Sequence, residues 1–135
     1  SWRNQFTNGK KGGGHRMANI LIVDDALFIR VILSEIITKA GHTIVGTAED
    51  GADGANKYKE LKPDLVFMDI TMPNVNGIEG VKRIRAIDPK ARIIMCSAMG
   101  QTPIVVEAIQ AGAMDFIVKP FTIEKIMESI RKAKV

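Results

Sequence analysis

Short apolar runs alternate with longer amphipathic stretches from Asn19 to the end of the chain. The apolar runs are unbroken, as expected of strands that are covered on both faces of a sheet. Between them, apolar residues recur every three or four positions, as they do along one side of a helix. The pattern predicts strands at residues 20–23, 43–47, 65–68, 92–96 and 116–118, helices at 27–39, 51–60 and 78–85, and further helices that begin at Thr102 and Ile123.

Strands that alternate with helices in this way favour a parallel sheet with helices on both faces. The sequence therefore predicts one α/β domain with a doubly wound (βα)5 architecture and a parallel five-stranded sheet. Each connection from a helix to the next strand contains a helix-breaking residue, namely Gly41, Pro63, Pro89 and Gly112. The two glycines are expected in the left-handed conformation that ends many helices.

Two predicted helices begin with capping signals. Asp50, with Asp53 three residues later, resembles the arrangement in which a side chain accepts a hydrogen bond from the first turn. Thr102 is expected to cap the helix that it opens, because a proline follows it in the first turn.

The excess of basic residues is confined to the first 16 residues of the chain. Residues 1–16 contain four basic residues and no acidic one, whereas residues 17–135 balance 15 basic side chains against 15 acidic ones. The main part of the chain thus has no excess positive charge for nucleic acid. We expect residues 1–16 to be an expression tag or disordered leader and Met17 to be the natural start of a domain at 17–135; the alternative is a native basic arm.

Other features of the composition point to an ordinary cytoplasmic domain. No apolar run approaches the roughly 20 residues that span a bilayer, so no membrane insertion is expected. The single cysteine, Cys96, cannot form an internal disulfide and is expected in the core. His42 follows a predicted helix end and is expected at the surface.

The connections that follow the strands contain most of the candidate chemistry. Asp24 and Asp25 follow the first strand, Asp69 the third, Ser97 the fourth and Lys119 the fifth. Because parallel strands end at the same edge of a sheet, these residues are expected to lie together, where ligands bind in this architecture. An Asp-Asp pair alone is more often a turn or a helix cap, so the inference depends on the joint placement.

Three carboxylates held close together repel one another, and burying them without partners is costly. Mg²⁺, which prefers oxygen ligands, would relieve that repulsion. Lys119 could pair with a phosphoryl oxygen, and Ser97 could donate a hydrogen bond to another. With such partners, Asp69 is a candidate nucleophile that forms an acyl phosphate.

Four segments resemble motifs of the receiver domain of two-component response regulators: Val23-Asp24-Asp25, residues 68–77 (MDITMPNVNG), residues 96–98 (CSA) and residues 118–121 (VKPF). The resemblance covers about residues 18–135 and is greatest to the stand-alone chemotaxis regulators of that family. It implies the flavodoxin-like form of the doubly wound (βα)5 fold. Since no residues are left for an effector domain, it also implies that output occurs by binding.

The resemblance implies a role for each carboxylate. Asp69 is expected to be the phosphorylated aspartate. Asp25 and Asp69 would ligate Mg²⁺ directly, Asp24 would act mainly through water, and the backbone carbonyl of Thr71 would complete the protein ligands.

It also implies a switch. Lys119 would contact the phosphoryl group, and Ser97 would swing toward it on activation. Phe116 occupies the position of the switch aromatic, where a tyrosine is common, and the Lys119-Pro120 bond would be cis. Thr71 and Met99 stand where other side chains are often found, so the dephosphorylation rate and the partner are not predicted.

The expected function is that of a phospho-accepting chemotaxis regulator. It would receive its phosphoryl group from a chemotaxis-type histidine kinase or a small acyl phosphate, and bind a motility motor or adaptor protein; a phosphatase is a further candidate partner. The alternative is a phosphorelay intermediate that passes the group to a histidine phosphotransfer protein. Beyond its own phosphorylation and dephosphorylation, no enzymatic turnover is expected.

Two other classes fit the sequence less well. A phosphohydrolase with an aspartate nucleophile typically needs a second carboxylate at the position of Thr71. A flavin or dinucleotide module would need a phosphate-binding loop where Asp24-Asp25-Ala26 stands.

Overall fold

Five parallel strands form the centre of the structure, a computed structural model that describes residues 17–135. The strands lie in the order β2-β1-β3-β4-β5, which leaves β2 and β5 at the edges of the sheet. The leader predicted at residues 1–16 lies outside the described residues. The strands are β1 (Asn19–Val23), β2 (Thr43–Ala48), β3 (Leu65–Met68), β4 (Ile93–Ser97) and β5 (Asp115–Val118).

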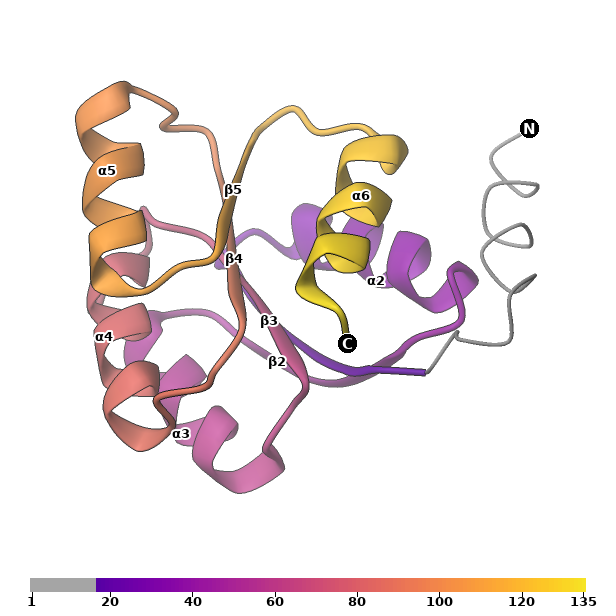
Figure 1. The fold of residues 1–135 in the computed structure, drawn as a ribbon, viewed down its shortest axis with the longest axis horizontal. Coiled ribbons are helices and arrows are strands. Elements are labelled where there is room, and N and C mark those ends of the chain that lie inside the picture. Colours follow the sequence, from indigo (N-terminus) through magenta and orange to yellow (C-terminus); the bar gives the residue numbers. More distant parts are fainter. Residues whose placement is uncertain (1–16) are drawn as a thin grey trace.

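Helices cover both faces of this sheet. Figure 1 shows α2 and α6 on one face and α3, α4 and α5 on the other. The predicted doubly wound architecture is therefore confirmed, with small shifts at the ends of some elements. The helices are α2 (Leu27–Lys39), α3 (Gly51–Leu61), α4 (Gly77–Ile87), α5 (Thr102–Ala111) and α6 (Ile123–Ala133).

The continuous apolar runs follow from this double cover. In β1, Leu21 and Val23 belong to the core under α3, α4 and α5, whereas Ile20 and Ile22 belong to the core under α2 and α6. All four side chains are fully buried. Because successive residues of a strand face opposite sides, a strand covered twice has no position for a polar residue until it ends.

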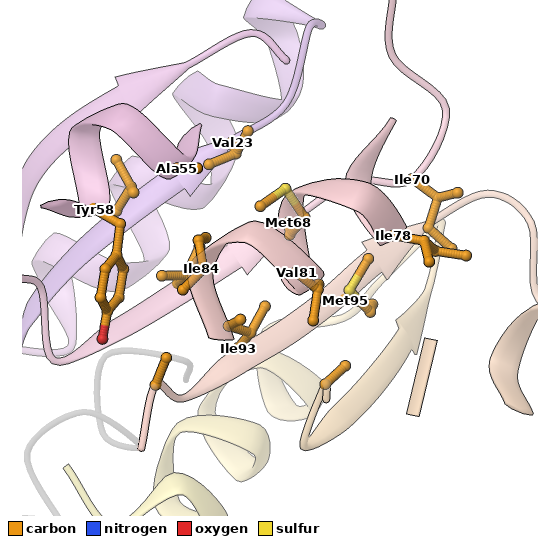
Figure 2. Close-up of a cluster of buried hydrophobic side chains, with 14 of the residues drawn as sticks. Val23, Ala55, Tyr58, Met68, Ile70, Ile78, Val81, Ile84, Ile93 and Met95 are labelled. Atoms are coloured by element: carbon orange, nitrogen blue, oxygen red, sulfur yellow. The ribbon is translucent and has the colours of Figure 1, made fainter. Parts of the chain in front are cut away.

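Helices α3 and α4 approach each other through glycines. A Cβ atom on Gly80 would lie 2.9 Å from the Cα of Gly51 and 3.0 Å from the Cε of Met68. Met68 lies in the core below these helices, near Val81 (Figure 2). The two helices thus meet at a distance that leaves no room for even a methyl group.

The ends of several helices agree with the sequence signals. The Asp50 side chain accepts a hydrogen bond from the Asp53 amide at 2.9 Å, which confirms the predicted cap of α3. Gly41 and Gly112 both have positive φ angles, 95° and 124°, as predicted for residues that end α2 and α5.

Two sequence predictions were wrong. Thr102 does not cap α5: the helix already includes it, and the capping position is Gln101, which makes no side-chain cap bond. His42 is only 7% exposed, and its Nδ1 accepts a hydrogen bond from the Ala18 amide at 3.1 Å. Because β1 pairs with β2 in parallel, His42, which precedes β2, lies beside Ala18, which precedes β1. This position buries the imidazole.

Within residues 17–135, no helix combines the length and the apolar character that a bilayer crossing requires.

Replacement of Gly80 by alanine tests the close contact between α3 and α4. The added methyl group must push α3 away, so we expect the free energy of unfolding to fall by about 1–3 kcal/mol, although alanine is the better helix former. Urea unfolding of Gly80→Ala measures this. Ala86→Leu, which enlarges an exposed residue of the same helix, should change stability by less than about 0.5 kcal/mol. A Gly80→Ala variant as stable as the wild type would contradict the packing described.

Candidate functional site

The ends of neighbouring strands bring the candidate residues together. The amide of Asp24 donates to the carbonyl of Ala48, and the amide of Asp69 donates to that of Val23, both at 2.9 Å. Each aspartate therefore lies one step beyond its own strand and remains tied to the strand beside it. The strand order reverses between β1 and β3, and in open α/β sheets such a switch point is where ligands bind.

Three carboxylates meet at this point. One carboxylate oxygen from each of Asp24, Asp25 and Asp69 lies within 4.8 Å of the others. Asp24 and Asp69 are buried, whereas Asp25 is exposed, so solvent reaches the cluster from the side of Asp25. A set made only of oxygen donors fits a hard divalent cation such as Mg²⁺.

Lys119 provides the positive charge in this cluster. Its Nζ lies 2.8 Å from Oδ2 of Asp24 and 3.7 Å from Oδ1 of Asp69. Its own amide donates to the carbonyl of Ser97 at 2.9 Å, which fixes it at the end of β5. The Lys119-Pro120 peptide bond is cis, as the family resemblance implied.

The environment shifts the titration of both partners. Burial raises the pKa of the Asp69 carboxyl, and the charge of Asp24 raises it further, against the opposing effect of Lys119. Burial alone would lower the pKa of Lys119, but its hydrogen bond to Asp24 and the charge of Asp69 together raise it. The site thus contains more negative charge than one lysine neutralises.

The loop after β3 holds Asp69 through a close backbone approach. A Cβ atom on Gly77 would lie 1.7 Å from the carbonyl oxygen of Asp69, and the Gly77 amide donates to the carbonyl of Ile70 at 2.8 Å. The carboxylate itself accepts a hydrogen bond from the Ile70 amide at 2.8 Å. Glycine at the first position of α4 therefore lets the loop fold back onto the strand end.

The loops after β3 and β4 touch beside the carboxylates. The Thr71 hydroxyl donates to the sulfur of Met99 at 3.0 Å, and the Met99 amide donates to Oγ of Ser97 at 3.2 Å. Ser97 is buried, whereas Thr71 and Met99 are exposed. The ligand role of the Thr71 carbonyl and the movement of Ser97 stay predictions.

Phe116 lies in the edge strand β5, opposite Met95 of β4. Its half-buried ring packs against the core under α3, α4 and α5. Its neighbours Met114 and Val118 are exposed. An aromatic side chain that is partly buried, three residues before Lys119, is compatible with the switch role that the resemblance implied.

The Cys96 prediction is confirmed: the side chain is buried, and burial raises the pKa of its thiol to about 12, so it is not a reactive thiolate near neutral pH.

Sequence reasoning missed one residue that contacts this site. The guanidinium of Arg30 donates a hydrogen bond to the backbone carbonyl of Asp24 at 2.8 Å. The signal was available but weak: Arg30 is the only charged residue in the first two turns of the helix that follows Asp24-Asp25.

Comparisons with known proteins agree with this geometry. Residues 20–131 match the family model described as the response regulator receiver domain. The chemotaxis protein CheY of Thermotoga maritima is 58% identical over 113 residues, which cover 84% of this chain and 94% of that protein. The chemotaxis protein CheY of Bacillus subtilis shows the same identity and the same coverage.

Solved structures give the same result for the fold. A chain from the structure of the CheX-CheY-BeF3-Mg complex from Borrelia burgdorferi superposes with a TM-score of 0.84 at 39% identity, covering 87% of this chain and 89% of that one. The response regulator domain of Thermotoga maritima CheB superposes with a TM-score of 0.82 at 40% identity, covering 88% and 97%. The predicted flavodoxin-like fold is thereby confirmed.

The raised pKa of Asp69 leads to a stability prediction. The pKa of this carboxyl is higher in the folded protein than its ordinary value of 3.8, so ionisation of the carboxyl destabilises the fold. The free energy of unfolding therefore falls as the pH rises from 3.8 through the raised pKa of the folded protein. Asparagine does not ionise. We therefore expect Asp69→Asn to be more stable than the wild type near neutral pH without metal, and to lose this advantage as the pH falls below 3.8.

Chemical denaturation at several pH values, in buffer with a chelator, measures the difference between the two proteins. Added Mg²⁺ should reduce it, because the ion stabilises the ionised wild type. Glu60→Gln, which neutralises an exposed carboxylate of α3, should show no such trend. An Asp69→Asn variant that is less stable than the wild type near neutral pH would contradict the electrostatic description of the site.

Proposed function

This chain belongs to the response regulator receiver domain family, and we propose that it is a chemotaxis regulator that is phosphorylated on Asp69 with the help of Mg²⁺. One observation supports the chemistry above all: Asp69 lies 3.7 Å from the ammonium of Lys119, in a group of three carboxylates. This combination offers a nucleophile, a charge partner and a set of oxygen ligands in one place.

The proposed reaction is a phosphoryl transfer to a carboxylate. An oxygen of Asp69 attacks the phosphorus of a phosphohistidine, a new P–O bond forms, and the P–N bond breaks. The electron pair of the broken bond stays with the imidazole nitrogen, which takes up a proton. With acetyl phosphate as donor, a P–O bond breaks instead and acetate leaves.

Asp24, Asp25 and Asp69 would hold Mg²⁺ together with the backbone carbonyl of Thr71. When bound, the ion would supply positive charge that offsets the repulsion between an incoming phosphoryl group and the carboxylates. Asp24 and Lys119 already form a pair at 2.8 Å. When a phosphoryl group joins Asp69, Lys119 gains a stronger anionic partner than Asp24, and we propose that it shifts toward that group.

Signal output would follow from a two-state equilibrium that phosphorylation biases. The Ser97 hydroxyl accepts a hydrogen bond from Met99 and keeps its own proton to donate to a phosphoryl oxygen. Four exposed apolar side chains could be covered by a partner: Val106 and Ile109 of α5, Met114 in the connection to β5, and Val118 of β5. We propose that Phe116 and Ser97 couple the site to the face of α5, β5 and α6.

The proposed partners are a chemotaxis-type histidine kinase and a motility motor or adaptor protein. The Borrelia CheY that resembles this chain was solved with CheX, so a CheX-type protein is a candidate partner, and a phosphatase is another. We further propose that residues 17–135 form the receiver domain, that it acts in the cytoplasm, and that its catalysis is restricted to its own phosphorylation and dephosphorylation.

The alternative, a phosphorelay intermediate, would pass the group on to a histidine phosphotransfer protein. Incubating the phosphorylated chain with chemotaxis kinase components, motor components and histidine phosphotransfer proteins of its own source separates the two. Phosphorylation-dependent binding to motor components supports chemotaxis, whereas transfer to a histidine phosphotransfer protein supports the relay.

The phosphorylation site itself is tested with acetyl phosphate and Mg²⁺, followed by intact-mass measurement. We expect one phosphoryl adduct on the wild type, and none on Asp69→Asn or in the presence of a chelator. Asp64→Asn, which removes an exposed carboxylate at the opposite end of β3, should label like the wild type. Equal labelling of Asp69→Asn and the wild type would show that the acceptor lies elsewhere.

Lys119 is expected to matter more for transmission than for acceptance of the phosphoryl group. We predict that Lys119→Ala forms the adduct about 10- to 100-fold more slowly, because one stabilising charge is lost. In nuclear magnetic resonance spectra, we expect phosphorylation to shift the methyl signal of Met114 in the wild type. In fully phosphorylated Lys119→Ala, this signal should stay where it is in the unphosphorylated protein. Lys90→Ala removes an exposed lysine near the start of β4 and serves as the control. A wild-type response in Lys119→Ala would remove Lys119 from the switch.

A further inference from the structure

Arg30 reaches back from the first turns of α2 to the loop that begins with the aspartates. Its Nη1 donates to the backbone carbonyl oxygen of Asp24 at 2.8 Å. Only 16% of its side chain is exposed, so most of this long side chain lies against the protein. The guanidinium also lies 4.0 Å from the carboxylate of Glu49, which is 72% exposed.

This hydrogen bond fixes the orientation of the peptide plane between Asp24 and Asp25. The carbonyl of Asp24 belongs to the peptide unit that joins Asp24 to Asp25, and this unit is planar. A donor that fixes the carbonyl therefore fixes the plane between the two aspartates. Rotation of that plane would turn the Asp25 backbone and move its carboxylate relative to Asp24.

The other bonds of Asp24 hold different atoms. Its amide donates to Ala48, and its carboxylate accepts from the Ala26 amide at 2.9 Å and from Lys119. The bond from Ala26 closes a turn over the Asp24–Asp25 peptide and so assists Arg30, but only Arg30 binds the carbonyl oxygen itself. In contrast, Asp25 is exposed, and the bond from Arg30 acts on the peptide that leads into it.

We propose that Arg30 is a positioning residue for the metal site, which holds the Asp24–Asp25 peptide so that both carboxylates face the same ion. This rests on the proposed function, because it assumes that the carboxylates bind Mg²⁺. Arginine suits the task, since its planar fork loses little freedom when it binds a carbonyl. Glu49 has a minor part, because an exposed pair at this distance contributes little.

The variant Arg30→Met removes the donor but keeps an apolar side chain of similar reach. We expect its dissociation constant for Mg²⁺, measured by isothermal titration calorimetry, to rise about tenfold, the lower end of the range for residues that orient metal ligands. Labelling by acetyl phosphate should slow at low Mg²⁺ concentrations and recover at high ones, because the variant has lost affinity for the ion and has kept Asp69 and Lys119.

Arg85→Met is the matched control. Arg85 donates from Nη1 to the carbonyl of Ala91 at 3.0 Å, which is the same type of bond at the amino end of β4, away from the carboxylates. Its loss should lower the free energy of unfolding by a similar amount, yet leave the affinity for Mg²⁺ within twofold of the wild type. Glu49→Gln should also remain within twofold.

A measurement on metal-free protein separates the proposed role of Arg30 from the proposed binding of Mg²⁺. In metal-free protein, the amide signals of Asp25 and Ala26 should shift in Arg30→Met more than in either control, because the peptide plane has changed. If Arg30→Met binds Mg²⁺ as tightly as the wild type, or if these amides do not move, Arg30 is not a positioning residue. If the wild type itself binds no Mg²⁺, the metal part of the proposed function is wrong, whatever the amides show.

Discussion

The ion pair between Lys119 and Asp24 is the contact on which the arrangement of the site depends. It joins the end of β5, an edge strand, to the end of β1, and so spans the sheet edge on which Asp69 lies. Without it, Asp24 would be a buried carboxylate beside a second buried carboxylate, a costly arrangement. Burial first and the charge of Asp24 second raise the pKa of the Asp69 carboxyl, and three carboxylates face the single ammonium of Lys119, so the pair leaves negative charge uncompensated. That excess gives the site a reason to bind a cation.

The fold concentrates charge here because the interior strands β1, β3 and β4 are covered on both faces and admit polar residues only at their ends. Close backbone approaches then fix where these ends lie. Gly77 lets the loop after β3 fold back onto the carbonyl of Asp69, and Gly80 lets α4 rest on α3. The packing of these two glycines thus helps to set the distances between the carboxylates at the strand ends.

Most of the fold and much of the site could be predicted because both follow from local patterns. Unbroken apolar runs identify strands, and parallel strands bring Asp24 and Asp69 to one edge without further information. The failures concern contacts between distant segments. His42 is buried by its bond to Ala18, which depends on the pairing of β1 with β2, and no property of its neighbours in sequence reports this. Arg30 was missed because its partner is a backbone carbonyl, which is not visible as a motif.

The same edge strand links the site to the exposed apolar face. A Cβ atom on Gly100 would lie 2.6 Å from the side chain of Val118, so the loop after β4 and the end of β5 are in steric contact. That loop follows Ser97, the last residue of β4, and Lys119 follows Val118 directly. A movement of Ser97 or Lys119 toward a phosphoryl group would therefore displace Val118, which is 48% exposed. Since an edge strand has a neighbour on one side only, β5 can yield to such a displacement more easily than β1 or β3. Under the proposed function, β5 is therefore the element through which phosphorylation of Asp69 would be read at the surface.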